Sequence, residues 1–137
     1  MPKIQKVIET ALYCDNLELM SSFYKEVLQL EIMVKDERLC AFNVNGQSVF
    51  LLFQREESRT PVSTAGGVIP PHHGLGPTHM AFAIEKNELS EWEIRLLQYN
   101  IKIVSQVQWP LGGTSIYFHD PENHLIELLT PGVWKIY

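Results

Sequence analysis

The stretch Gly76-Pro77-Thr78-His79-Met80-Ala81-Phe82-Ala83-Ile84 has the features of a β-strand with one histidine near its start. It is short, mostly apolar and opened by Gly-Pro. Because side chains alternate along a strand, His79 shares one face with Ala81 and Ala83, and the larger apolar side chains lie on the other. A histidine followed by two small residues on one strand face indicates a surface with room for a ligand in front of it. Such a histidine can bind a ligand or simply pack, so the rest of the chain must supply partners.

The composition limits the classes of protein to which this chain can belong. The chain has 137 residues, 45% of them hydrophobic and 20% charged, which fits one soluble globular domain. A net charge of −5 gives no footprint for nucleic acid, and no apolar run reaches the roughly 20 residues that span a membrane. The first residues lack the apolar core of a signal peptide. We therefore expect a cytoplasmic protein with no nucleic-acid or membrane partner, in which Cys14 and Cys40 are reduced packing residues.

Hydrophobic periodicity predicts one order of elements twice: a strand, a helix and three further strands. The first set is expected at 7–14, 17–28, 30–35, 38–44 and 48–54, and the second at 76–84, 87–99, 101–109, 114–119 and 124–129.

This repeat indicates a single domain, 1–137, built from two βαβββ modules at 4–54 and 77–131. Each module alone would leave a sheet face uncovered, so the predicted fold is α+β, with paired modules forming a curved mixed sheet around a cleft. The connecting loop 55–76 is rich in Pro, Gly, Ser and Thr. It is expected to be long, irregular and mobile, as lids and linkers are.

Overlaying the two modules makes Glu9 and His79 equivalent, since each lies early in the first strand of its module. The same overlay of the last strands places Glu127 where the first module has Leu51. A carboxylate between Leu125 and Leu129 on one strand face is costly unless it is paired or bound to a metal. Two inward carboxylates and one imidazole would make a three-ligand metal site. Alternatively, each glutamate points into solvent.

Four segments make the chain resemble one known family. They are Glu9 to Glu18, Phe23 to Leu28, Gly76 to Phe82, and Tyr117 to Glu127 with its Asp-Pro turn. The chain is thereby similar to the vicinal oxygen chelate superfamily of glyoxalases, bleomycin-resistance proteins and extradiol dioxygenases. The resemblance implies a glyoxalase-like domain whose metal ligands, by position, are Glu9, His79 and Glu127.

The sequence departs from the family pattern at several places. The first ligand is commonly His or Gln, but here it is Glu9. Four-ligand glyoxalase I has a further Glu where this chain has Leu51, which argues against that enzyme. Asn123 replaces the usual Gly of the Asp-Pro turn, and Asn tolerates the left-handed conformation required there. His119 stands where many relatives have Arg.

Two functions follow from the resemblance. In the first, a divalent ion (Mn²⁺, Zn²⁺, Ni²⁺, Fe²⁺ or Mg²⁺) chelates neighbouring oxygens of a small-molecule substrate, and Glu9 or Glu127 assists as a catalytic base. Lyase, isomerase, epoxide-opening and dioxygenase chemistry all remain open. One His with two Glu differs from the two-His-one-carboxylate triad of iron oxygenases. In the second, the chain is a metal-free drug-binding protein of the bleomycin-resistance type. The resemblance also implies a homodimer.

Several other side chains could serve either the site or the fold. His72 and His73 could contact a substrate from the connection or could be solvated. Tyr117 and Trp109 could line a cleft or could be core aromatics. His124 falls on the strand face opposite Glu127, which favours a structural role.

Overall fold

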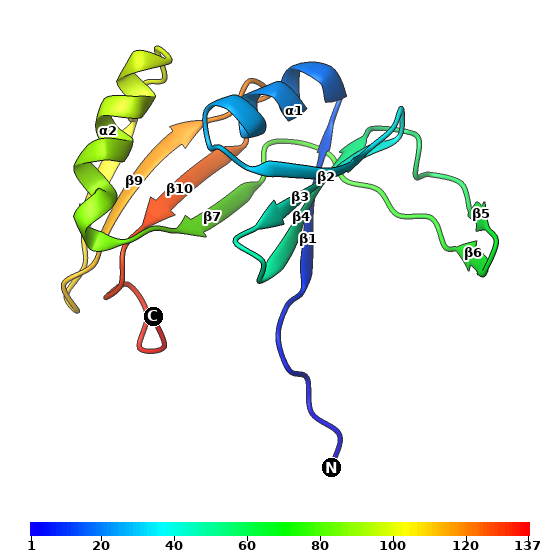
Figure 1. Cartoon of the computed structure of the whole chain (residues 1–137), viewed down its shortest axis with the longest axis horizontal. Helices are drawn as coiled ribbons and strands as arrows, with labels where there is room; N and C mark the ends of the chain where they lie inside the picture. Colours follow the sequence, from blue (N-terminus) through cyan, green and yellow to red (C-terminus); the bar gives the residue numbers. More distant parts are fainter. The chain divides into compact units, whose positions relative to one another are not determined.

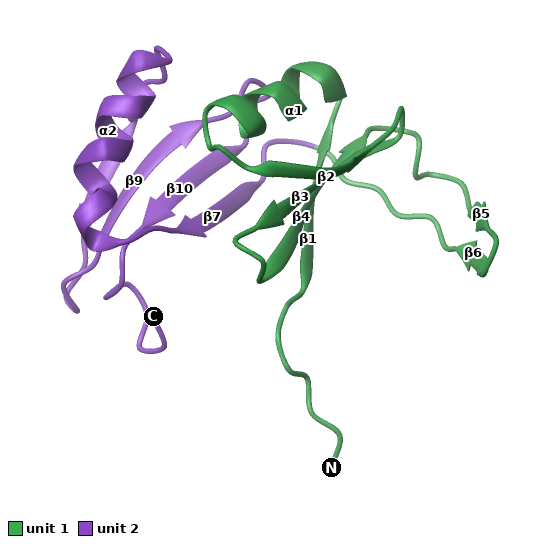
Figure 2. Cartoon of the chain, in the orientation of Figure 1, with its two compact units in different colours: residues 1–75 green, residues 76–137 purple.

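The structure is a computed structural model that describes every residue from 1 to 137. It divides into two compact units, residues 1–75 and residues 76–137 (Figure 2). Each unit contains a four-stranded mixed sheet and one α-helix, in the chain order strand, helix, strand, strand, strand (Figure 1). The predicted α+β class and the repeat of elements are confirmed.

Unit 1 forms a sheet in the order β1-β4-β3-β2, in which β1 runs parallel to β4 and the other neighbours are antiparallel. Its elements are β1 (Glu9–Cys14), α1 (Leu17–Glu26), β2 (Glu31–Lys35), β3 (Leu39–Val44) and β4 (Ser48–Gln54). The first strand begins two residues later than the sequence predicted. Glu9 therefore opens β1 instead of lying inside it, and Val7 is 72% exposed.

Helix α1 packs against β3 and β4. It begins where the Asn16 side chain accepts a hydrogen bond from the backbone N–H of Leu19, at 2.9 Å, which is a standard N-cap. Its buried stripe places Tyr24 edge-to-face on Phe50, with 4.8 Å between ring centroids. Phe42 stacks on Phe50 in the same layer. Both cysteines are free and buried, as predicted.

The connection between the two βαβββ sets contains regular structure. Strands β5 (Val62–Thr64) and β6 (Gly67–Ile69) form an antiparallel hairpin whose last pair is Thr64 with Gly67. The prediction of an irregular loop was wrong over these residues. The local signal was present, because β-branched residues flank the turn at Ala65-Gly66, but it was outweighed by the high Pro and Gly content of the segment.

Unit 2 forms a sheet in the order β7-β10-β9-β8, with β7 parallel to β10. Its elements are β7 (His79–Ala83), a 3₁₀ turn η1 (Lys86–Glu88), α2 (Leu89–Gln98), β8 (Ser105–Gln108), β9 (Thr114–His119) and β10 (Leu125–Leu129). Asn123 closes the β9–β10 turn with a φ of 67°, the left-handed conformation expected for it. His124 is buried and bonds Asp120 through Nδ1, at 2.8 Å, in the structural role predicted.

The pairing registers show how closely the units repeat. Glu9 pairs with Val49 in unit 1, and His79 pairs with Leu125 in unit 2. Two residues further on, Ala11 pairs with Leu51 and Ala81 pairs with Glu127. The registers agree with the overlay drawn from the sequence, in which Leu51 is the counterpart of Glu127.

Candidate metal centre

Strands β7 and β10 bring His79 and Glu127 together within unit 2. The His79 Nε2 atom lies 3.8 Å from Oε2 of Glu127, too far for a hydrogen bond. On its other side, His79 Nδ1 lies 2.8 Å from the backbone carbonyl of Leu125. A carbonyl only accepts, so Nδ1 carries the proton, and in the neutral ring the lone pair sits on Nε2. Two electron-pair donors therefore face one another across a short gap.

Glu127 is a buried carboxylate with few partners. The residue is 6% exposed, and its neighbours on β10, Ile126 and Leu128, point into the apolar core on the opposite face. Tyr117 stands opposite Glu127 in the register of β9 with β10. A buried carboxylate needs charged or hydrogen-bonding partners to offset its lost hydration. The Tyr117 phenol is the polar side chain that stands opposite it.

Tyr117 also lies beside the pair, whereas the sequence left open whether it lines a cleft or belongs to the core. It pairs in register with Glu127, and its ring stacks beside the His79 imidazole with 6.3 Å between centroids. Burial raises the pKa of the Tyr117 phenol, and its hydrogen bond to Glu127 raises it further. The hydroxyl is thus a stable donor near neutral pH. The tight turn at Asp120 to Asn123 could have revealed this, because it fixes which β9 residue lies opposite Glu127.

Glu9 belongs to unit 1, where it opens β1 with an exposed side chain. It lies on the same strand face as Ala11 and Tyr13. The structure contains no group of three or more His, Cys, Asp or Glu side chains placed to hold an ion. Of the three predicted ligands, the structure places His79 and Glu127 close to one another. The role of Glu9 as a ligand stays a prediction.

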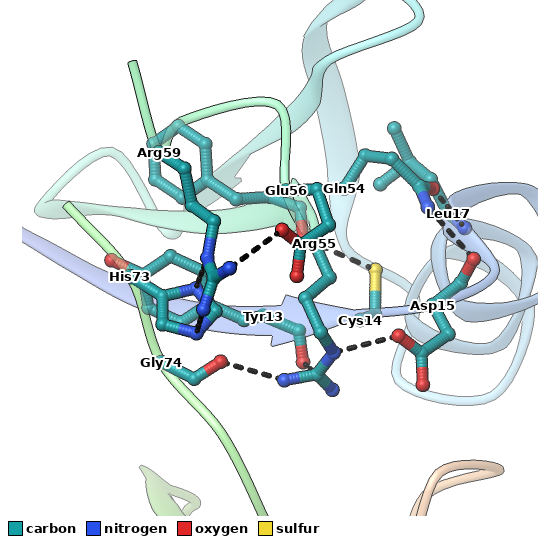
Figure 3. A network of polar contacts seen from close by, with 11 residues as sticks. Tyr13, Cys14, Asp15, Leu17, Gln54, Arg55, Glu56, Arg59, His73 and Gly74 are labelled. Atoms are coloured by element: carbon teal, nitrogen blue, oxygen red, sulfur yellow. Dashed lines mark hydrogen bonds and ion pairs between the residues drawn. The ribbon is translucent and has the colours of Figure 1, made fainter. Parts of the chain in front are cut away.

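The two histidines of the connection are tied to unit 1. His72 Nδ1 shares a hydrogen bond of 2.5 Å with the Tyr13 hydroxyl, and its ring lies edge-on to Phe53 at 4.5 Å. This differs from the solvated role weighed for His72. The His73 ring accepts a hydrogen bond at Nε2 from Arg59, at 3.0 Å (Figure 3). These contacts fix the end of the connection that leads into unit 2.

Arg55 also holds the connection against unit 1. Its guanidinium lies between the Asp15 carboxylate and the backbone carbonyl of Gly74, donating to each at 2.6 Å (Figure 3). Gly74 is required there, because a Cβ at this position would collide with the Tyr13 ring. Arg55 therefore has a structural role in unit 1, joining the start of the connection to its end.

Comparison with known proteins shows the family of the chain. The profile of the Glyoxalase/Bleomycin resistance protein/Dioxygenase superfamily matches residues 6–128. The metallothiol transferase FosB of Shouchella clausii is 31% identical over 117 residues, which cover 84% of this chain and 73% of that protein. FosB of Bacillus licheniformis is 30% identical over 120 residues, covering 87% and 71%.

Among solved structures, lactoylglutathione lyase from Agrobacterium tumefaciens is 32% identical, with a TM-score of 0.86 over 98% of this chain and 99% of that one. None of the helices is long and apolar enough to cross a membrane. The chain belongs to the Glyoxalase/Bleomycin resistance protein/Dioxygenase superfamily.

Proposed function

We propose that this protein is a divalent-metal-dependent, glyoxalase-like enzyme in which Glu9, His79 and Glu127 hold the ion. The observation that carries the proposal is the facing pair in unit 2, where Oε2 of the buried Glu127 lies 3.8 Å from Nε2 of His79, the ring nitrogen that is not bonded to the Leu125 carbonyl. Atoms bound to one ion at about 2.0–2.2 Å each can be separated by up to about 4.4 Å. The observed gap lies within this limit.

The surroundings of His79 also fit a metal ligand. A ligating histidine usually donates its other ring N–H to a backbone carbonyl or carboxylate, which fixes the tautomer and orients the ring. Leu125 supplies that carbonyl. One imidazole with two carboxylates is a mixed donor set that suits Mn²⁺, Zn²⁺, Ni²⁺, Fe²⁺ or Mg²⁺.

The chemistry proposed is Lewis-acid catalysis on a small oxygen-rich substrate. A bound ion stabilises negative charge that develops on neighbouring substrate oxygens. Glu9, exposed at the start of β1, is the residue proposed to exchange a proton with the substrate. Tyr117 stands opposite Glu127 on the neighbouring strand β9. Having one histidine and two glutamates makes dioxygenation the least favoured of the reactions considered.

The names of the relatives narrow the substrate class. One group is named metallothiol transferase and the solved structure is named lactoylglutathione lyase, and both names refer to a thiol or a thiol derivative. We therefore favour a reaction in which a thiol compound is substrate or co-substrate, as transferase or lyase chemistry. Lactoylglutathione is the first compound to test.

The test measures metal content and its dependence on the three residues. Protein purified without chelator is analysed for bound metal, then stripped and titrated with Mn²⁺, Zn²⁺ and Ni²⁺. We expect one ion per chain in the wild type and sharply weaker binding in Glu9→Gln, His79→Ala and Glu127→Gln. Glu57→Gln, at an exposed residue of unit 1, is the matched control and should bind normally. Full uptake by His79→Ala would refute the assignment.

A second candidate is a metal-free protein that binds an apolar small molecule. It is favoured by the sheet face of unit 1 opposite α1, where Ala41, Leu51 and Phe53 pack with Ala11 and Tyr13 into an apolar cluster. Stoichiometric binding of a drug-like ligand by the metal-stripped protein, without any metal uptake, would support this function over the first.

We also expect a homodimer, which is the state that the family resemblance implies. Light scattering at micromolar concentration should give twice the mass of 15.8 kDa. A monomer under these conditions would argue against any site that needs residues from two chains.

A further inference from the structure

The turn between β9 and β10 is closed by two buried polar side chains, Asp120 and His124, which are 3% and 2% exposed. The Nδ1 atom of His124 lies 2.8 Å from Oδ2 of Asp120. The other carboxylate oxygen, Oδ1, accepts the backbone N–H groups of Glu122 and His124, each at 3.0 Å. An ionised carboxylate only accepts, so Nδ1 of His124 is the donor in this bond. The Asp120 side chain therefore ties together three points of one turn.

The backbone of the turn is bonded across the same residues. The Asp120 N–H donates to the His124 carbonyl at 3.1 Å, and the Asn123 N–H donates to the Asp120 carbonyl at 3.0 Å. The direction in which β10 leaves the turn is thus fixed by side chains and backbone together.

Leu125 is the first residue after the turn, and both of its backbone groups face β7. Its N–H donates to the Thr78 carbonyl at 2.8 Å, and its own carbonyl accepts from His79 Nδ1 at 2.8 Å. Leu125 and His79 stand opposite one another in the register of this parallel pair. When the His79 ring is neutral, the bond to Leu125 leaves the lone pair on Nε2, which lies 3.8 Å from Oε2 of Glu127.

Unit 1 has a turn of the same length that lacks the bonded pair. By the registers of the flanking strands, Val44 occupies the place of Asp120 and Ser48 occupies the place of His124. A valine side chain has no polar atom, so no such bond can form there. The first strand of unit 1 begins with the carboxylate of Glu9, which has no N–H for a backbone carbonyl to orient. The bonded pair therefore occurs in the unit that carries the histidine.

We propose that Asp120 and His124 are positioning residues, which fix the Leu125 carbonyl and through it the tautomer of the His79 ring. With the proton held on Nδ1, Nε2 is available as an electron-pair donor beside Glu127. The use of this nitrogen for metal binding rests on the proposed function, whereas the control of the tautomer does not. Neither Asp120 nor His124 touches the ion or the substrate.

The first measurement is the tautomer of His79, followed by ¹⁵N NMR on the whole chain without metal. The spectra are recorded at about pH 8.5, where histidine rings are ordinarily neutral. His79→Ala assigns the resonances, and wild type should carry the proton on Nδ1. His124→Leu removes the donor to Asp120 with a side chain of similar volume. The ratio of the Nδ1–H form to the Nε2–H form should then fall about 2–10-fold, the change expected when a hydrogen bond of ordinary strength is lost.

His124→Asn separates the positioning role from packing. Its amide N–H lies close to the place of Nδ1 and can donate to Asp120, but the smaller side chain leaves a cavity. The Asn variant should therefore be less stable than wild type and keep the wild-type tautomer ratio. If His124 only filled space, leucine would serve better than asparagine. Should His124→Leu not fold, His124→Phe removes the same donor, keeps a ring and gives the same comparison.

The matched control is Ser48→Ala, at the equivalent position of the unit 1 turn, and it should leave the His79 tautomer unchanged. Calorimetric titration with Zn²⁺ provides a second readout. Loss of a residue that directly orients a metal ligand typically weakens binding about 10–100-fold. Because His124 acts one step further out, we expect a loss of about tenfold in His124→Leu and none in His124→Asn.

The positioning role and the proposed function fail separately. An unchanged tautomer ratio in His124→Leu, or the same fall in His124→Asn, would overturn the positioning role whatever the metal content. If wild type takes up no Zn²⁺, the proposed function falls. A tautomer ratio that falls in His124→Leu and is kept in His124→Asn would support the positioning of His79 in either case.

Discussion

At the position where unit 2 carries Glu127, unit 1 carries Leu51, and the two residues are almost equally buried, at 6% and 9% exposure. The strands around them pair in the same registers. Opposite Glu127 stands Tyr117, whereas opposite Leu51 stands Ala41. One backbone pattern therefore supports an apolar face in one unit and a polar cluster in the other. In unit 2 the buried carboxylate stands opposite a phenol, whereas the equivalent position of unit 1 is aliphatic and stands opposite alanine.

The largest effect is expected when the carboxylate is placed in the unit that lacks donors. Leu51→Glu should lower the free energy of unfolding by about 3–5 kcal/mol, the range for a buried charge without a partner. Chemical denaturation measures this change. Leu51→Met conserves volume and should cost less than about 1.5 kcal/mol. If Leu51→Glu lowered stability no more than Leu51→Met does, the face of unit 1 would accept a carboxylate. The contrast between the two units would then disappear.

The reverse exchange tests whether Glu127 is kept for a metal. The pair Glu127→Leu with Tyr117→Phe replaces two facing polar groups by apolar ones of similar shape, which can be nearly neutral for stability. The metal-free variant should be about as stable as wild type. Wild type should gain about 2.7 kcal/mol at a hundredfold excess of Zn²⁺ over its dissociation constant, and the variant should gain almost none. Thermal unfolding with and without Zn²⁺ measures both. Equal gains would show that the ion binds elsewhere.

A third change is made where the end of the connection lies against the strands of unit 1. Gly74→Ala should lower stability by about 1–3 kcal/mol, because the new methyl group overlaps the Tyr13 ring and forces it to move. Introducing Tyr13→Leu beside it should recover part of the loss. Denaturation of the single and double variants provides the measurement, and additive losses would contradict the steric explanation.

The smallest effect is expected when a single hydrogen bond between the connection and the first strand of unit 1 is removed. Tyr13→Phe deletes the bond to His72 and should cost about 0.5–1.5 kcal/mol. Amide exchange at His72 to Gly74 should become faster, since the attachment of the connection is weakened. Tyr99→Phe, at the exposed C-cap residue of α2, should alter neither quantity. Unchanged exchange in the Tyr13 variant would show that Arg55 and Arg59 are sufficient to hold the connection.

Much of the fold was readable from local patterns. Two strands, 48–54 and 114–119, have the bounds that the sequence predicted, because clear turn residues flank them. The hairpin β5–β6 was missed because its strands have only three residues each and lie among prolines and glycines. The strand expected over 101–109 is restricted to Ser105–Gln108, the residues that pair in register with β9.

The repeat, the strand faces and the equivalence of Glu9 with His79 could be predicted from the chain alone, because they depend on alternation and on short turns that connect near neighbours. The bonding partners of the polar groups could not, because they lie far apart in the sequence. The carbonyl that fixes the His79 tautomer lies 46 residues away along the chain, and the phenol that fixes His72 lies 59 residues away. Such pairs form when distant strands take their register, and the register depends on the packing of each whole sheet, which no local pattern records.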